Sequence, residues 1–156
     1  EKSVSEAFGC VSKDIESQGV QVVGVINNAG VSPGLPVELE SMGAVLACFE
    51  VNLFGAYRMI RTFLPLLRAS EGRIINISSM GAIVARPMKS VYTATKCALE
   101  GMTQSLRMEV APFGVSVSII RPGYIKTAFA AKQLGNNLPF KDLSKSEYGF
   151  FLFLFD

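Results

Sequence analysis

Three short runs rich in β-branched residues, separated by long helical patterns, constrain the fold of this chain more than any other feature. The runs lie at 21–26 (QVVGVI), 73–77 (RIINI) and 115–120 (VSVSII). A helical pattern precedes the first run, and helical patterns fill most of both intervals between the runs. Strands that alternate with helices form a parallel sheet with right-handed crossovers. The order therefore predicts an α/β chain whose parallel sheet is covered by helices on both faces.

The three helical patterns differ in how their apolar residues are arranged. The first, at about 4–17, places one stripe toward the core and ends toward Gly19: Val4, Ala7, Phe8, Val11 and Ile15. The second, at about 38–69 with Pro65 near its end, is apolar around much of its circumference and is expected to be buried on several sides. The third, at about 90–111, is stopped by Pro112 and Gly114. Its expected buried face consists of Val91, Ala94, Ala98, Met102, Leu106 and Val110.

Length and charge bound the class of protein. The chain has 156 residues, of which 49% are hydrophobic, enough for one compact domain with a core. No internal repeat or linker divides residues 1–156. The net charge is +2, and the Lys and Arg residues are scattered, so no nucleic-acid partner is expected.

Histidine and cysteine usage exclude several chemistries. The chain has no histidine, which removes Ser-His-Asp hydrolysis and His-ligated zinc, and no metal site is expected. Any general base must be another residue. The three cysteines, Cys10, Cys48 and Cys97, are far apart in apolar, helix-like sequence, and they are expected to be buried thiols in a reducing compartment.

The last part of the chain, 128–156, is loose and polar at first and is expected to be a mobile flap over the substrate. Its closing run 150–155 (FFLFLF) is either buried in an intact protein or the product of a truncated or mis-spliced chain. The apolar run 149–155 is too short to span a bilayer, and no membrane association is indicated. We expect a location in the cytoplasm or on a cytosol-facing endomembrane surface.

The residues directly after the predicted strands are the first candidates for a site, because ligands of parallel α/β sheets bind at the carboxyl ends of the strands. They are Asn27, Ser78, Ser79 and Arg121. The sequence 27–30 (NNAG) has small residues that let a ligand approach the backbone, although an ordinary turn has the same composition. A serine hydroxyl there can polarise a substrate oxygen, although most such serines cap a turn or helix.

Tyr92 and Lys96 are four residues apart in the third helix, so their side chains share one face. Such a pair is common and usually without function. Inside a site, however, an ammonium stabilises the phenolate and lowers the phenol pKa from its usual value of about 10. Tyr92 is then a usable proton acceptor.

At this point the sequence resembles the short-chain dehydrogenases and reductases. The resemblance rests on five motifs in order: NNAG at 27–30, VNLFG at 51–55, NISS at 76–79, YTATK at 92–96 and RPGYIKT at 121–127. Each motif is weak alone, and together in register they are highly specific. The resemblance implies a Rossmann-like, doubly wound parallel sheet and hydride transfer between a substrate alcohol or ketone and NAD or NADP.

The resemblance also implies roles for particular residues. Ser79, which has the family's spacing to the tyrosine, would hold the substrate oxygen, and Tyr92 would transfer the proton. Lys96 would lower the tyrosine pKa and bind the nicotinamide ribose, and Asn52 would support a water of the proton relay. The segment 122–127 (PGYIKT) would flank the nicotinamide, with Ile125 and Thr127 at its carboxamide. The full set implied to bind cofactor is Asn28, Ala29, Gly30, Tyr92, Lys96, Pro122, Gly123, Ile125 and Thr127.

The sequence departs from the family in one important respect. The glycine-rich turn TGxxxGxG, which holds the cofactor pyrophosphate, does not occur in these residues, and neither does the residue that selects NAD or NADP. The sequence resembles a family member that begins at the helix before the fourth strand and ends before the last strand. Exposed sheet edges would make such a chain a poor folder, and we expect it to be inactive by itself.

The substrate and the rival functions are less constrained. Apolar residues at Ile83, Val84, Met88 and Phe129 suggest a lipid-like, steroid-like or retinoid-like substrate, unless they only pack against the flap. The sequence also resembles the retinol, steroid and hydroxybutyrate branch of the family.

One alternative function is that of an epimerase or dehydratase with the same Tyr-Lys pair, which the NNAG motif disfavours. Another is a non-catalytic Rossmann-like relic or scaffold. The resemblance further implies a homo-oligomer in a complete protein.

Overall fold

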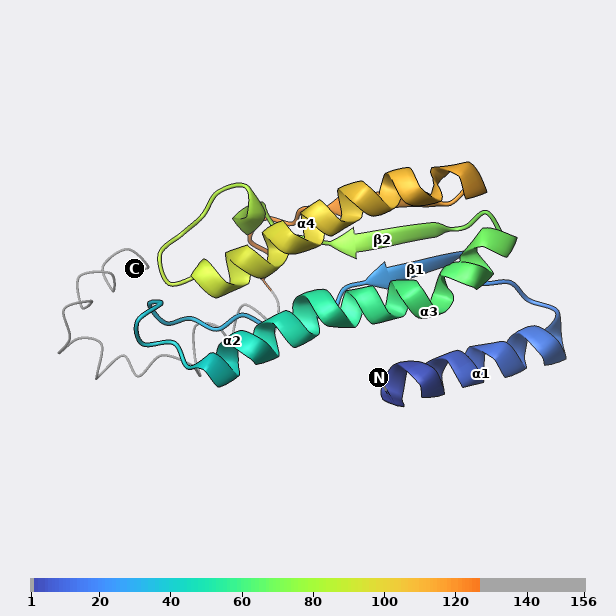
Figure 1. Ribbon diagram of the computed structural model, residues 1–156, viewed down its shortest axis with the longest axis horizontal. Helices are drawn as coiled ribbons and strands as arrows, with labels where there is room; N and C mark the ends of the chain where they lie inside the picture. Colours follow the sequence, from blue (N-terminus) through green and yellow to red (C-terminus); the bar gives the residue numbers. More distant parts are fainter. Residues whose placement is uncertain (1, 127–156) are drawn as a thin grey trace.

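The computed structural model describes residues 2–126, which form a three-stranded parallel sheet packed against helices (Figure 1). Thr127, Phe129 and the region 128–156, with its run 150–155, lie outside the described residues. The strand order is β1-β2-β3. In chain order the elements are α1 (Lys2–Gln18), β1 (Gly24–Asn27), α2 (Met42–Phe49), η1 (Glu50–Phe54), α3 (Gly55–Ala69), β2 (Arg73–Ile77), η2 (Met80–Ala82), α4 (Ser90–Val110), η3 (Ala111–Phe113) and β3 (Ser116–Ile120).

The strands lie close to their predicted positions. β2 occupies the predicted residues, and β3 begins one residue later than predicted. β1 begins three residues later than predicted and includes Asn27. Pairing starts with Gly24 opposite Arg73 in the first ladder and with Arg73 opposite Ser116 in the second.

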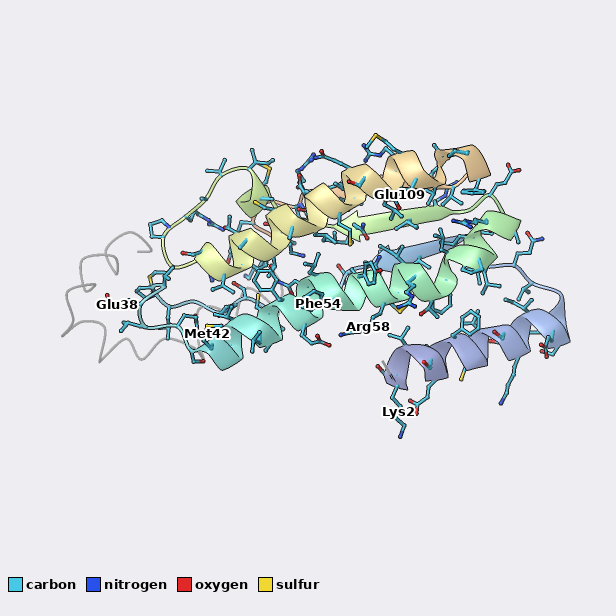
Figure 2. The ribbon with its side chains drawn as sticks, viewed as in Figure 1. Lys2, Glu38, Met42, Phe54, Arg58 and Glu109 are labelled. Carbon is cyan, nitrogen blue, oxygen red and sulfur yellow. The ribbon has the colours of Figure 1, made fainter. Side chains whose placement is uncertain are left out.

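The second helical pattern is one continuous helix with a change of winding. α2 begins after Ser41, whose Oγ accepts the Ala44 amide at 3.2 Å, and the π-helical turn η1 joins α2 to α3. One stripe is buried: Cys48, Asn52, Ala56, Ile60, Phe63 and Leu67. The opposite side is exposed at Met42, Leu46, Phe54 and Tyr57, and Figure 2 labels Met42 and Phe54. The expectation of burial on several sides is therefore wrong, because the sheet covers only one side of this helix.

The same helix is the one element of the described residues that could cross a bilayer by length and composition. It spans Met42–Ala69, has 28 residues and has a mean hydropathy of 1.2 in its most apolar window. Core helices of soluble proteins pass the same test. The helix is therefore only a weak indication of membrane contact.

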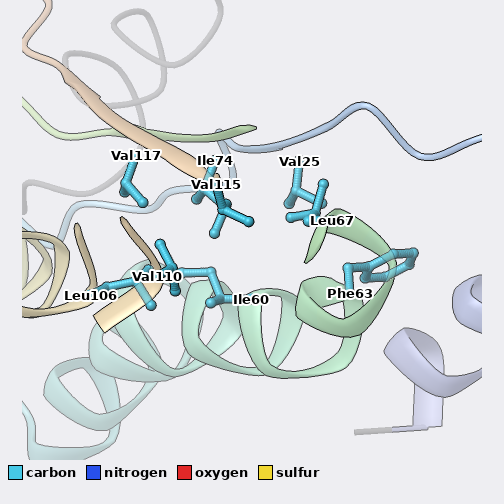
Figure 3. Close-up of a cluster of buried hydrophobic side chains, with 9 residues drawn as sticks. All are labelled: Val25, Ile60, Phe63, Leu67, Ile74, Leu106, Val110, Val115 and Val117. Atoms are coloured by element: carbon cyan, nitrogen blue, oxygen red, sulfur yellow. The ribbon is translucent and has the colours of Figure 1, made fainter. Parts of the chain in front are cut away.

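The core lies between one face of the sheet and the two long helices (Figure 3). Its side chains come from β1 and β2, from α3, from α4 and from the segment around β3: Val25, Ile74, Ile60, Phe63, Leu67, Leu106, Val110, Val115 and Val117. α1 adds Phe8, whose ring meets Phe63 edge-on at 5.5 Å. α1 ends as predicted at Gly19, which has φ +65°.

Helices cover a single face of the sheet among the described residues. The other face exposes apolar side chains, with Ile26 of β1 65% and Ile120 of β3 48% exposed. Both crossovers, β1 to β2 and β2 to β3, step in the same direction, so right-handed connections place α3 and α4 on the same side. The parallel α/β order is as predicted, and the described residues supply one of the two expected helical layers.

α4 buries a different face from the expected one. Of the six expected residues only Leu106 and Val110 are buried, and Ala94 is exposed. The other buried residues of α4 are Thr95, Lys96, Leu99, Glu100 and Thr103. A search for apolar periodicity missed this face, because much of it is polar and faces the ends of the strands. α4 ends through η3 at Gly114, which has φ +72°, as the predicted stop signal requires.

The cysteines differ from expectation in a similar way. Cys48 is buried, but Cys10 and Cys97 are exposed, and all three are free thiols. The expectation that all are buried is wrong for two of them, because α1 and α4 each turn a polar or small-residue face toward solvent at these positions.

Candidate active site

Ser79 and Tyr92 meet at the carboxyl end of β2. Ser79 is extended, and its Oγ accepts the Gly81 amide at 3.0 Å, which starts the short helix η2. A Cβ atom placed on Gly81 would lie 3.3 Å from Ser79 Oγ and 3.6 Å from Tyr92 Cε1. The hydroxyl and the phenol ring therefore border the same small space, which a side chain at position 81 would enter.

Ser78, the other candidate serine, has a different environment. It is buried, and its Oγ donates a hydrogen bond of 2.8 Å to Glu100 Oε1. Successive side chains of an extended segment point to opposite sides, so Ser78 and Ser79 face apart. The contacts of Ser78 are internal to the fold, which favours Ser79 as the serine that meets a substrate.

Lys96 lies one helical turn beyond Tyr92 on α4. Its Nζ is 5.7 Å from the centre of the Tyr92 ring and donates a hydrogen bond of 2.7 Å to the Ile77 carbonyl oxygen. Lys96 is only 4% exposed. Burial lowers the pKa of the Lys96 ammonium, and the nearby Cys48 thiol acts weakly in the opposite direction. A cation with few hydrogen-bond partners thus lies directly behind the tyrosine.

Asn52 lies in the π-helical turn η1 and fixes the loop that follows β1. Its Oδ1 accepts the Val31 amide at 2.8 Å, and its Nδ2 donates to the Val31 carbonyl at 2.9 Å. Nδ2 is also 3.0 Å from Thr95 Oγ1, which in turn donates to the Tyr92 carbonyl at 2.7 Å. Asn52 therefore connects the loop after β1 to the helix that carries Tyr92. Its predicted role in holding a water stays a prediction.

The NNAG loop joins the site at Gly30. A Cβ atom at Gly30 would lie 3.6 Å from Asn52 Oδ1 and 3.8 Å from Lys96 Nζ. Asn28 and Ala29 are exposed beside it. The small residues predicted to bind cofactor therefore form an open rim next to the lysine.

The segment after β3 lies beside the segment after β2. The Met80 amide donates to the Pro122 carbonyl at 3.0 Å, so the two strand ends continue to pair beyond the sheet. Gly123 and Ile125 are exposed at this edge. The structure thus brings together every predicted site residue from Asn28 to Pro122 at one edge of the sheet, and Gly123 and Ile125 follow directly.

Three polar residues of α4 that were not predicted also bind residues of the site or of the strands that lead to it. Thr95 contacts Asn52, Thr103 accepts from Asn76 Nδ2 at 2.8 Å, and Glu100 binds Ser78 and Arg121. Glu100 follows Lys96 by four residues, as Lys96 follows Tyr92. This four-residue spacing is the signal in the sequence that indicates Glu100 on the same helix face.

The residues present fit the nicotinamide half of a dinucleotide cofactor. The observation that supports this fit is the open rim at Gly30, where a side chain would contact the Lys96 ammonium. An ammonium and small residues are suitable partners for ribose hydroxyls. The glycine-rich turn for the pyrophosphate does not occur in the sequence.

A sequence model of short chain dehydrogenases matches residues 3–137. The chain belongs to this family. It is 35% identical to the mitochondrial D-beta-hydroxybutyrate dehydrogenase of Mus musculus over 158 aligned positions, which cover 95% of this chain and 46% of the relative. It is 40% identical to estradiol 17-beta-dehydrogenase 2 of Mus musculus over 134 positions, which cover 85% of this chain and 34% of the relative.

The fold is shared with solved members of the family. An oxidoreductase of the short-chain dehydrogenase/reductase family from Brucella ovis, in complex with a partially ordered NAD, superposes with a TM-score of 0.74 at 25% identity. The match covers 85% of this chain and 62% of that protein. The predicted family and Rossmann-like class are confirmed, and this short-chain dehydrogenase chain spans less than half the length of the curated relatives named above.

Proposed function

We propose that this chain carries the catalytic half of an NAD(P)-dependent oxidoreductase that interconverts an alcohol and a ketone or aldehyde. The observation that supports this most strongly is the meeting of Ser79 Oγ and the Tyr92 ring at Gly81, with the Lys96 ammonium behind the ring. This is a hydroxyl donor beside a proton carrier, with a cation 5.7 Å from the centre of the phenol ring.

The proposed chemistry assigns one step to each side chain. Ser79 donates a hydrogen bond to the substrate oxygen and holds it beside the phenol. Tyr92 accepts the alcohol proton in oxidation and returns it in reduction. Lys96 stabilises negative charge on the phenol oxygen, and Asn52 keeps the loop after β1 in place. The side chains supply orientation and electrostatics.

The cofactor would lie along the rim formed by the strand ends. Asn28, Ala29 and Gly30 would border one side, Lys96 would bind the ribose, and the segment 122–125 would flank the nicotinamide. When bound, the nicotinamide accepts or donates the hydride. The chain offers no residue that decides between NAD and NADP, so both belong to the proposal.

We propose an apolar substrate, of lipid, steroid or retinoid type. Ile83 and Val84, in the segment between Ser79 and Tyr92, are 60% and 59% exposed. Met88, which was expected to line the pocket, is buried instead and has φ +62°, so it supports the turn before α4. One relative is named for estradiol, an apolar alcohol, and another for D-beta-hydroxybutyrate, a small hydroxy acid, so both substrates belong in the test. Location and homo-oligomer formation stay predictions.

The decisive experiment joins this chain to the part of a relative that it does not cover. Residues 1–156 replace the matched region of the D-beta-hydroxybutyrate dehydrogenase from Mus musculus, giving a chimera whose Ser79, Tyr92 and Lys96 come from this chain. We expect NAD(P)-dependent turnover of an apolar secondary alcohol or of D-beta-hydroxybutyrate. Tyr92→Phe should abolish turnover and leave the circular dichroism spectrum unchanged. A folded chimera without turnover would reject the proposal.

The 156-residue chain by itself provides a second measurement. Because the sequence lacks the glycine-rich turn, we expect no binding of NADH or NADPH by nicotinamide fluorescence. Binding by the chain alone would show that the rim at Gly30 and Lys96 holds the cofactor without a pyrophosphate site.

A further inference from the structure

The ends of β2 and β3 continue side by side beyond the sheet. The Ser78 amide donates to the Ile120 carbonyl at 2.8 Å, and the Met80 amide donates to the Pro122 carbonyl at 3.0 Å. Ser79 lies between these two hydrogen bonds. Its position relative to the segment that follows β3 therefore depends on how firmly the two strand ends are held together.

Glu100 binds both strand ends at once. Its Oε1 accepts the Ser78 hydroxyl at 2.8 Å and Arg121 Nε at 2.7 Å, and its Oε2 accepts Arg121 Nη2 at 2.8 Å. The Glu100 side chain is only 9% exposed. A buried carboxylate thus bridges the residue before Ser79 and the first residue after β3.

The stripe of α4 that contains Tyr92 and Lys96 also contains Glu100, each residue one helical turn from the next. Lys96 binds the Ile77 carbonyl, and Glu100 binds the Ser78 hydroxyl. A single rigid helix therefore holds consecutive residues of the β2 end and presents Tyr92 to the residue that follows them.

We propose that Glu100 is a positioning residue: through Ser78 and Arg121 it fixes the distance between the Ser79 hydroxyl and the segment 122–125. This inference rests on the proposed function of Ser79 and of that segment. It identifies an electrostatic clasp in which one carboxylate holds Ser78 and Arg121 together.

The geometry requires a carboxylate. Both oxygens of Glu100 are used, and they accept three hydrogen bonds from two residues. Glutamine has one acceptor oxygen, and its amide group would face the guanidinium donors of Arg121. Glu100→Gln is therefore nearly isosteric but cannot hold Ser78 and the bidentate Arg121 together.

The first test measures the strand ends themselves by hydrogen exchange on the folded chimera. We expect the Ser78 and Met80 amides to exchange at least about tenfold faster in Glu100→Gln and Glu100→Ala than in the parent. Glu109→Ala, which removes an exposed carboxylate from the same helix, should exchange like the parent. Unchanged exchange at Ser78 and Met80 in the Glu100 variants would overturn the proposal, whether or not the chimera turns over.

The second test separates positioning from general destabilisation. In the chimera we expect Glu100→Gln to lower kcat by about tenfold or more at a temperature where it stays folded, because small displacements at a reacting centre are costly. The KM for the substrate should change less than kcat. Leu106→Ala, a core truncation on the same helix, should lower the unfolding temperature at least as much as Glu100→Gln does and leave kcat unchanged.

Equal losses of kcat in the two variants would show that Glu100 is merely structural and overturn the proposal. A parent chimera without turnover would instead reject the proposed function, and the exchange measurement would still decide the role of Glu100.

Discussion

Asn27 Nδ2 donates a hydrogen bond of 2.7 Å to Asn76 Oδ1, between two residues that are paired across the parallel strands β1 and β2. Asn76 is fully buried, and its own Nδ2 donates to Thr103 Oγ1 at 2.8 Å. Two strands and a helix are thus joined by one amide side chain at the point where the strands approach the site. Polar groups in such a place are costly unless every one is paired.

Asn76→Ala should therefore lower the free energy of unfolding by about 1–3 kcal/mol, because it leaves the buried Thr103 hydroxyl and the Asn27 amide without this partner. Urea denaturation followed by circular dichroism measures the change. Ser118→Ala, on an exposed position of β3, is the matched control and should change it by less than about 0.5 kcal/mol. Equal effects of the two substitutions would contradict this account of Asn76.

Gly81→Ala should impair catalysis in the chimera. The new Cβ would lie 3.3 Å from Ser79 Oγ, a contact that requires the hydroxyl to give way by a few tenths of an ångström, and 3.6 Å from Tyr92 Cε1, an ordinary contact. We expect kcat to fall by about tenfold or more, measured as NAD(P)H formation.

Gly101→Ala is the matched control for that measurement. Gly101 lies on the exposed side of α4, and a Cβ there meets nothing within 4 Å. Alanine at an open helical position should raise stability by about 0.5–1 kcal/mol and leave kcat unchanged. If Gly81→Ala behaved like Gly101→Ala, the small space between Ser79 and Tyr92 would have no catalytic importance.

The sequence was a good guide to the strands and to the positions of Ser79, Tyr92 and Lys96 for a simple physical reason. Ser79 follows a strand, and Tyr92 and Lys96 share a helix face, so local periodicity already places them at the end of the sheet. The roles of Thr95, Glu100 and Thr103 depend on which face of α4 meets the strand ends, and this is a tertiary property. Burial of the helix Met42–Ala69 likewise depends on tertiary packing. Its apolar residues Leu46 and Phe54 are exposed because no described element covers them.

The Glu100 clasp makes stability depend on acid pH. The hydrogen bonds from Arg121, and secondarily the one from Ser78, lower the pKa of the Glu100 carboxyl below its ordinary value, although burial opposes them. A depressed carboxyl pKa contributes stability that is present above the unfolded-state value of about 4.3 and is lost as pH falls through the folded value. We therefore expect the urea midpoint of the parent to fall more steeply below about pH 4.3 than that of Glu100→Gln. Parallel curves for the two proteins would mean that Glu100 does not titrate with folding.

Lys96 should give the opposite dependence at alkaline pH. Its pKa is lowered, chiefly by burial, from the unfolded-state value of about 10.4, so the folded chain gives up this proton more readily than the unfolded chain. The free-energy cost of burying the ammonium is fully present below the folded pKa and disappears as pH rises through it toward the unfolded value.

The variant Lys96→Met has a side chain of similar length and no charge. The gain in its free energy of unfolding over the parent should therefore be largest near neutral pH and should decline as pH rises toward about 10. Urea denaturation of both proteins across this range measures the difference. Ser118→Ala, at an exposed position of β3, should show a constant difference from the parent over the whole range. A constant difference for Lys96→Met as well would show that its ammonium pays no burial cost, and the tyrosine would then lack the poorly solvated cation that the proposed proton transfer uses.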